Sequence, residues 1–266
     1  MEPTELKTPP PIHDAVPPTE GTPPPESTGE AGLPRFLVLW AIVVALAAGV
    51  LAWAGGEATY DFYRPSKEAA AEPYAFKQLN QERDIADGRN AAIAYGMLGA
   101  AVGLGLGAAA GLSRRSTRGA VSGGLAGLIL GGIAPALIAP WVVPLHRKWY
   151  WPETPDLKLP IMVHGTMWCA LGAAAGLAFG IGLGNRRWLP RTVVGGLIGA
   201  ALATILFHAL GAILFPYSRA DLPIAETQGV RLLSRLLVAV GVAIGVAWSV
   251  RETRRKPSPV SELPTS

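Results

Sequence analysis

Six long apolar stretches limit what this chain can fold into. They cover residues 36–54, 91–112, 120–140, 161–184, 192–215 and 236–250. A helix rises about 1.5 Å per residue and the hydrocarbon core of a bilayer is about 30 Å thick, so a span needs about 20 apolar residues. Only 16% of the residues are charged, whereas a soluble domain carries about a quarter. We therefore predict an all-α fold, a polytopic membrane bundle of six transmembrane helices.

The sixth stretch is short for a membrane span. Residues 236–250 reach a workable length only if the helix begins near Leu232. Arg235 would then lie within the span, and we expect its side chain to extend toward the lipid headgroups. The other five stretches contain no Asp, Glu, Lys or Arg, although ion-coupled transporters and intramembrane enzymes usually keep ionisable groups there.

Arginines between the stretches predict the orientation in the membrane. The short connections 113–118 and 185–191 each carry three arginines and no acid. The alternate connections, of which residues 55–90 are the longest, mix acids with bases. Because cytoplasmic loops are enriched in Lys and Arg, both termini should face the cytoplasm and 55–90 should lie outside it. Within that loop, residues 73–90 are expected to form an amphipathic helix on the membrane surface.

The two ends of the chain differ from the span-forming region in composition. Residues 1–35 are rich in Pro, Glu, Thr and Gly and have little to bury, which predicts a disordered Pro-rich cytoplasmic tail. Residues 251–266 are expected to form a basic cytoplasmic tail, which leaves 36–250 as the transmembrane domain. The Ala-, Gly- and Arg-rich composition suggests an integral protein of the bacterial inner (cytoplasmic) membrane.

A sequence repeat relates the second and third spans to the fourth and fifth. The offset is 72 or 73 residues, and it aligns glycines, double arginines and a proline: Leu98-Gly99 with Leu171-Gly172, Arg114-Arg115 with Arg186-Arg187, Gly123-Gly124-Leu125 with Gly195-Gly196-Leu197, and Pro144 with Pro216. Each unit would be a helical hairpin, about 91–145 and 161–216. Two hairpins in the same orientation make a tandem parallel repeat.

Glycines recur every fourth residue along these hairpins. Residues four apart share one helix face, and glycine on that face lets two backbones approach in lipid, where helices associate through close van der Waals contact. The pattern predicts glycine-zipper hairpins whose packing residues are Gly99, Gly103, Gly107, Gly111, Gly119, Gly123, Gly127, Gly131, Gly172, Gly176, Gly180, Gly184, Gly195 and Gly199.

Two histidines within the spans are the best candidates for a polar site. His164 and His208 would lie near the outer ends of the fourth and fifth spans, with Thr166 and Thr204 close by in sequence. If the two helices are neighbours, the histidines can meet and form a proton relay or half of a metal site. Histidines that only hydrogen-bond a backbone carbonyl or an aromatic neighbour are the simpler alternative.

A metal site is disfavoured by the directions in which the candidate ligands point. Met162, Met167 and Cys169 are soft ligands suited to Cu(I) or Zn. At about 100° per residue, however, Met162 and Cys169 share one helix face while His164 and Met167 lie roughly opposite. We therefore predict no metal and no cofactor. Cys169 is the only cysteine, so no internal disulfide is possible.

The sequence leaves three classes of function open. It has no Walker loop, H-E-x-x-H or nucleophile elbow, and no basic stripe interleaved with aromatics, so neither an enzyme nor a nucleic-acid binder is expected. We expect a tightly packed assembly or complex subunit in the lipid bilayer, with membrane-protein partners or a second copy of itself. The alternatives are a transporter or channel for a small solute, with a cavity between the repeated hairpins, and a metal-handling membrane protein.

Overall fold

The computed structural model describes residues 37–66, 76–149, 157–219 and 221–251, all of which belong to one unit, residues 33–266. Within these residues the chain is helical, without strands. The helices are α1 (Leu37–Ala58), α3 (Phe76–Ser113), α4 (Thr117–Trp149), α5 (Lys158–Leu183), the short 3-10 helix η1 (Arg186–Trp188), α6 (Leu189–Leu214) and α7 (Gln228–Arg251). The tails predicted for 1–35 and 251–266 lie outside the described residues, apart from Arg251 at the end of α7.

All six long helices are long and apolar enough to cross a membrane. The all-helical class and six helices long and apolar enough to span a membrane, both expected from the sequence, are therefore confirmed within the described part of the chain. An isolated run of such helices in water would expose far more apolar surface than soluble proteins do. The fold is that expected of a multi-pass membrane protein.

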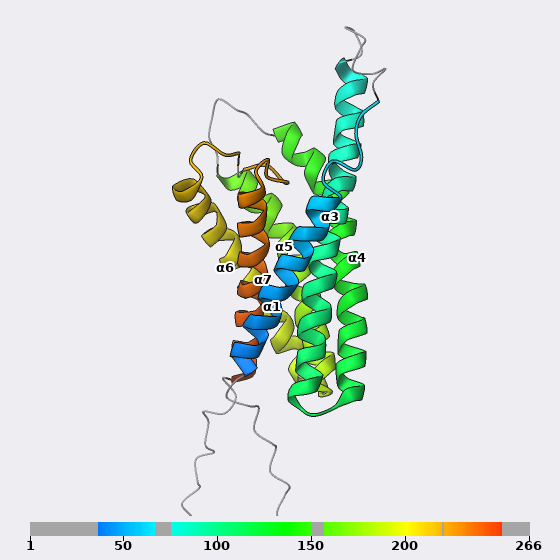
Figure 1. The fold of residues 1–266 in the computed structure, drawn as a ribbon, viewed down its shortest axis with the longest axis vertical. Coiled ribbons are helices and arrows are strands. Elements are labelled where there is room, and N and C mark those ends of the chain that lie inside the picture. Colours follow the sequence, from blue (N-terminus) through cyan, green and yellow to red (C-terminus); the bar gives the residue numbers. More distant parts are fainter. Residues whose placement is uncertain (1–36, 67–75, 150–156, 220, 252–266) are drawn as a thin grey trace, which may run out of the picture. The chain divides into compact units, whose positions relative to one another are not determined.

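Successive long helices run in opposite directions, so the bundle has two distinct ends (Figure 1). One end holds the start of α1, the end of α7 and the two arginine-containing connections, and we call it the turn end. The other end holds the described residues 59–66, 215–219 and 221–227, and we call it the loop end. This alternation brings residues from the first and last helices to the same end.

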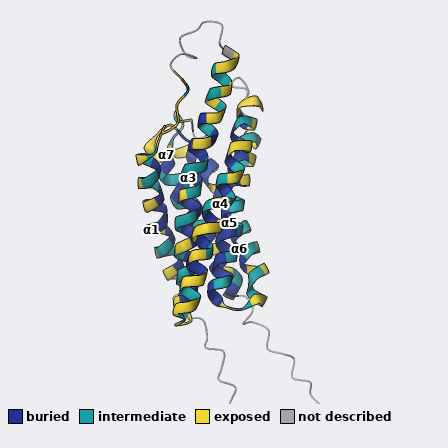
Figure 2. Ribbon diagram, turned by 90° about the vertical axis from the view of Figure 1, so that its right-hand side faces the viewer, coloured by how far each residue is buried: buried dark blue, intermediate teal, exposed yellow. Residues whose placement is uncertain are grey.

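Helix α5 is the central element of the bundle. It contacts α3, α4, α6 and α7, while α1 packs on α3 and α7. Its side chains Trp168 and Phe179 are fully buried. Buried residues lie between the helices and exposed ones on the outside (Figure 2). Large apolar side chains such as Leu137 and Leu202 are among the exposed residues. That distribution suits a bundle surrounded by lipid.

Helix α3 is longer than the predicted second span. It runs for 38 residues without a break, so it includes residues that we assigned to a surface helix over 73–90. The prediction of a separate surface helix is wrong. Residues 76–90 are mainly good helix formers without a proline, and nothing in them stops the helix before it enters the apolar stretch.

Helix α4 likewise extends past the predicted end of the third span near Pro140. Its 33 residues include Pro135, Pro140 and Pro144. A proline cannot donate to the carbonyl four residues earlier, and membrane helices tolerate this where a neighbouring helix covers the freed group. The carbonyl that Pro135 leaves without a helical donor belongs to Gly131, and it lies directly against Gly99 of α3.

Glycines hold α3 and α4 in backbone contact. A Cβ atom added to any of four α3 glycines would overlap the backbone of α4, and the facing positions are Gly99 with Gly131, Gly103 with Gly127, Gly107 with Gly123, and Gly111 with Gly119 and Ala120. Gly182 of α5 lies against Gly107 and Gly123. Any larger residue at these positions would force the helices apart.

The second hairpin pairs in a different register. Gly172 is aligned with Gly99 in the sequence repeat, but it faces Gly196, which is aligned with Gly124 and not with Gly131. The pairing is thus displaced by seven residues, about two helical turns. Further along α5, Gly176 faces Thr192, and Gly180 meets Leu189 and Thr192.

Helix α6 uses a second glycine face toward α7. Gly195 lies against Gly245, and Gly199 lies against Gly241. The shorter glycine ridge that the sequence shows on this helix is therefore packed against the last helix of the bundle, while Gly196 serves the contact with α5.

Gly184 ends α5 instead of packing against a helix. Its φ is 66°, in the left-handed region that glycine adopts without strain, and its N–H donates to the carbonyl of Ile181. The neighbouring carbonyl of Leu183 accepts a hydrogen bond from Arg114 in the α3–α4 connection. The two arginine-containing turns are thus joined directly.

Candidate functional site

The two candidate histidines meet inside the bundle. The rings of His164 on α5 and His208 on α6 lie 5.2 Å apart, centroid to centroid. Both are buried, and Trp168 and Phe207 pack around them with ring centroids between 5.2 and 5.5 Å. We call these four residues the aromatic cluster.

Each histidine is tied to its own helix. The Nδ1 atom of His164 lies 3.2 Å from the carbonyl of Pro160, and Nδ1 of His208 lies 2.9 Å from that of Thr204. A carbonyl can only accept, so each Nδ1 carries the proton. Nε2 of His208 is buried and has no hydrogen-bond partner among the described residues. Unpaired polar atoms of this kind are costly, and each one calls for an explanation.

The two candidate threonines do not complete a common site. Thr204 is buried and donates to the carbonyl of Ala200, 2.9 Å away. Thr166 is exposed and donates to the carbonyl of Met162 in its own helix, 2.7 Å away. A transport path lined by all four polar residues would need Thr166 to point inward.

The soft ligands of α5 diverge in the way that the helical spacing predicts. Met162 is 68% exposed, whereas Met167 is fully buried on the face of His164. Cys169 approaches the carbonyl of Leu197 at 3.8 Å. Among the described residues, no group of three His, Cys, Asp or Glu side chains is arranged to hold a metal ion.

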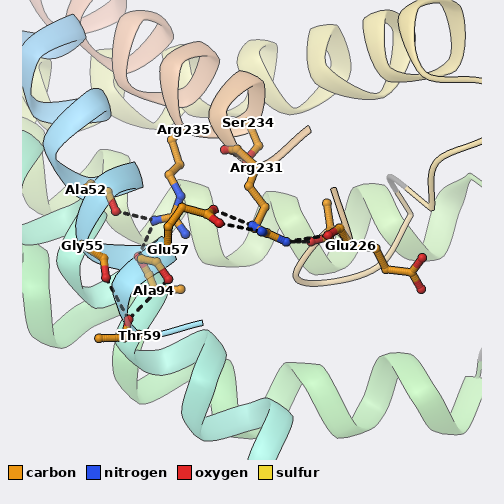
Figure 3. Close-up of polar contacts among 11 residues, drawn as sticks. Ala52, Gly55, Glu57, Thr59, Ala94, Glu226, Arg231, Ser234 and Arg235 are labelled. Carbon is orange, nitrogen blue, oxygen red and sulfur yellow. Dashed lines mark hydrogen bonds and ion pairs between the residues drawn. The ribbon is translucent and has the colours of Figure 1, made fainter. Parts of the chain in front are cut away.

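A second polar site lies at the loop end, where sequence reasoning did not place one. It is formed by Glu57 of α1 with Arg231 and Arg235 of α7 (Figure 3). Nε and Nη2 of Arg231 each donate to one carboxylate oxygen of Glu57, both at 2.6 Å. Two parallel charge-assisted bonds of this kind are among the strongest in proteins.

Arg231 is almost fully occupied by its neighbours. Its Nη1 donates to the carbonyls of Ala225 and Glu226 at 2.8 and 2.7 Å, and its guanidinium carbon lies 4.0 Å from the ring centroid of Tyr60. The segment before α7 is therefore folded back onto an arginine in the first turn of the helix. Pro223 in that segment also accepts a hydrogen bond from the hydroxyl of Tyr95 and interacts with His164.

Arg235 corrects the prediction made for the sixth span. The helix begins at Gln228, well before Leu232, and Arg235 is only 5% exposed instead of reaching the headgroups. Its Nη1 donates to the carbonyls of Ala52 and Ala94, both at 3.1 Å (Figure 3). The side chain points inward because these two neighbouring helices offer carbonyls to a buried cation, which is cheaper than leaving it unpaired.

Gly56 provides the space that Arg235 occupies. A Cβ atom at this position would lie 2.5 Å from Nη2, 2.8 Å from Cζ and 3.0 Å from Nη1 of the arginine. The adjacent Gly55 differs, because its added Cβ would meet only the flexible end of Met97, at 2.9 Å from Cε. Of the two glycines at the end of α1, only Gly56 must lack a side chain to leave room for the guanidinium of Arg235.

Beside Arg235 the structure has a cavity of about 360 Å³, partly open at the loop end. It lies between α1, α3, α4, α7 and the described residues 219 and 222–226. Its lining is Gly56, Thr59, Tyr60, Asp61, Asp87, Asn90, Ala94, Val143, His146, Arg147, Arg219, Leu222, Pro223, Ile224, Glu226 and Arg235. A volume of this size is that of a small-molecule site. His164 and His208 do not line it, and it is not between the two predicted repeat units.

The spacing of the charged residues in the sequence could have indicated this polar site. Arg231 and Arg235 are four residues apart and thus share a helix face, and Glu57 follows a glycine pair at the end of an apolar stretch. Charges placed at the edges of apolar helices either reach the headgroups or pair with each other. Choosing between the two outcomes required knowing that α1 and α7 are neighbours.

Comparison with known proteins gave no match to a family model, to a curated protein or to a solved structure. The class of protein is therefore defined by the fold itself, six helices of membrane-spanning length and apolarity.

Proposed function

We propose that this protein is an assembly subunit of a bacterial inner-membrane complex, without catalytic chemistry of its own. The observation that carries the proposal is the backbone contact between helices: glycines of α3 face α4, and those of α6 face both α5 and α7. Contacts this close favour a rigid scaffold over a bundle that opens around a solute.

The polar residues also favour a scaffold over a transporter. A path between the hairpins would bring His164, Thr166, Thr204 and His208 to one cavity, but Thr166 is exposed and the histidines lie in the aromatic cluster. Bulky rings and glycine contacts occupy the region that the transporter alternative assigns to a solute path. A metal-handling role has less support still, because Met162 points away from the histidines.

The outer face of α4 is the surface we assign to a partner membrane helix. Five large apolar side chains spaced four residues apart form a ridge opposite the glycine face, with exposed fractions from 50% to 81%: Leu125, Ile129, Ile133, Leu137 and Trp141. Of the six spans, α4 is the one least covered by the rest of the bundle. A continuous ridge of this kind can interdigitate with a second helix.

Photo-crosslinking at this ridge tests the proposal. A benzophenone amino acid replaces Leu137 in the full-length protein in living cells, and the matched control replaces Leu202 on α6, which is 62% exposed against 65% for Leu137. We expect a discrete crosslinked protein at Leu137 and only lipid adducts at Leu202. A product of twice the chain's mass would identify the partner as a second copy. Lipid adducts alone at both positions would overturn the assembly function.

We infer a shared origin and a defined orientation for the two hairpins. The aligned arginines and glycines support a tandem parallel repeat over about 91–145 and 161–216, which then diverged in helix register. The arginine-rich connections support a cytoplasmic turn end. Orientation is tested with Cys169→Ser as background and either Thr117→Cys or Thr227→Cys added. A membrane-impermeant maleimide on intact spheroplasts should label only Thr227→Cys, and labelling of Thr117→Cys instead would reverse the orientation.

A further inference from the structure

We propose that the loop-end cavity binds a small carboxylate that also carries an amine, with its carboxylate on the free edge of Arg235. This would be a binding site in addition to the assembly role. The cavity is lined by groups from α1, α3, α4 and α7 and from the described residues 219 and 222–226, so a ligand in it would touch the elements that meet at this end of the bundle.

The first argument is the unused edge of Arg235. Arg235 is only 5% exposed, and its two hydrogen bonds to described residues both come from Nη1. Nε and Nη2 form the planar edge with which arginine takes a carboxylate in two parallel bonds. Arg235 lines the cavity, and in the part of the chain that the structure describes this edge makes no hydrogen bond, so it is available to an anion.

The second argument is that the nearby acid is already engaged. Glu57 lies close enough to act electrostatically on Arg235, but each of its oxygens is bonded to Arg231. The positive charge of Arg235 is therefore not neutralised by a direct ion pair within the described part of the chain. A buried charge without such a pair is costly, and an anionic ligand relieves that cost.

The third argument concerns the mouth of the cavity. Of the acids that line it, Asp87 bonds Arg147, and Glu226 lies 3.8 Å from Arg219. Asp61 makes no ion pair with any residue the structure describes, and its side chain is exposed at the mouth. An acid at the mouth repels a dianion such as phosphate and attracts an amine. One buried cation and one free acid therefore match a zwitterion.

Binding of three radiolabelled probes to the purified full-length protein in detergent tests the proposal. The probes are alanine, propionate and inorganic phosphate. We expect saturable binding of alanine, weaker binding of propionate by about tenfold for the lost amine contact, and no saturable binding of phosphate up to about 10 mM. Absence of saturable alanine binding over this range overturns the proposal. Tighter binding of phosphate than of alanine also overturns the proposal. Propionate binding as tightly as alanine would overturn the part of the proposal that gives the ligand an amine.

Two variants place the ligand. Gly56→Ala displaces the guanidinium and should weaken alanine binding at least about tenfold, whereas the matched control Gly55→Ala should leave it within about twofold. Asp61→Asn should weaken alanine binding but not propionate binding, and it is structurally mild because φ at Asp61 is 56°, a conformation that asparagine adopts readily. Elution volume and Tm report whether each variant folds. Equal losses in Gly56→Ala and Gly55→Ala, or no effect of Asp61→Asn on alanine, would contradict the assigned pose.

Discussion

Gly103 of α3 and Gly127 of α4 face each other so closely that a methyl group on either would overlap the backbone of the other. The contact lies near the middle of a ladder of four such pairings, and each pairing is set four residues from the next. Because the two backbones touch, dispersion contacts along the whole hairpin depend on each glycine being kept.

Gly103→Ala should destabilise the protein by about 2 kcal/mol or more, because α3 and α4 must separate to admit the methyl group. The measurement is the unfolding midpoint in detergent titrated with SDS. The matched control is Gly165→Ala on α5, where the added Cβ would meet only Cγ2 of Thr204 at 3.9 Å. That variant should be neutral, or more stable by about 0.5–1 kcal/mol through helix propensity. Equal effects of the two substitutions would contradict the packing role of Gly103.

The Glu57–Arg231 pair should account for most of the coupling between α1 and α7 at the loop end. Removing one partner, in Glu57→Gln or Arg231→Gln, leaves the other charge poorly compensated and should cost about 3 kcal/mol. The double variant should be less destabilised than the sum of the two, by about 2 kcal/mol. A double-mutant cycle on unfolding free energies measures this coupling.

A more exposed ion pair provides the comparison for that cycle. Arg147 bridges Asp84 and Asp87, but its side chain is 40% exposed and both acids are also partly exposed. The cycle between Arg147→Gln and Asp84→Asn should give a coupling below about 1 kcal/mol, as is usual for ion pairs in contact with solvent. A coupling as large as that of Glu57 with Arg231 would show that burial is not what distinguishes the two pairs.

Because Nε2 of His208 has no partner among the described residues, we expect this position to tolerate an apolar ring. His208→Phe keeps a ring in the aromatic cluster and removes a buried polar atom that has no partner among the described residues, so the unfolding free energy should change by less than about 1 kcal/mol. Trp168→Ala, in the same cluster, should cost about 3–5 kcal/mol because it leaves a large cavity. A large loss in His208→Phe would indicate that the imidazole has a role beyond packing.

Much of the fold was predictable because apolar length and glycine spacing are local properties. The six spans follow from runs of about 20 apolar residues, and the facing of Met162 away from His164 follows from the helical period alone. The meeting of His164 with His208 was expected on the condition that their helices are neighbours, and the connection between α5 and α6 is short enough to make them so.

The remaining features depend on contacts between residues far apart in the sequence. From its position in the sequence, Arg235 is expected to reach the headgroups. The carbonyls of Ala52 and Ala94, which accept its hydrogen bonds, explain why it points inward instead. The register of the second hairpin was also hidden, since Gly172 and Gly196 occupy places that the repeat assigns to a different pairing. Element ends were missed where α3 and α4 continue beyond their apolar stretches.

The ion pair between α1 and α7 also sets the order in which the bundle can be completed. Glu57 and Arg231 are 174 positions apart. At about 5–20 residues per second, a ribosome needs roughly 9 to 35 seconds to make the intervening chain. During that time the first helix has been synthesised but the guanidinium that neutralises its carboxylate has not. The contact between α1 and α7 at the loop end can therefore form only after the last helix has been made.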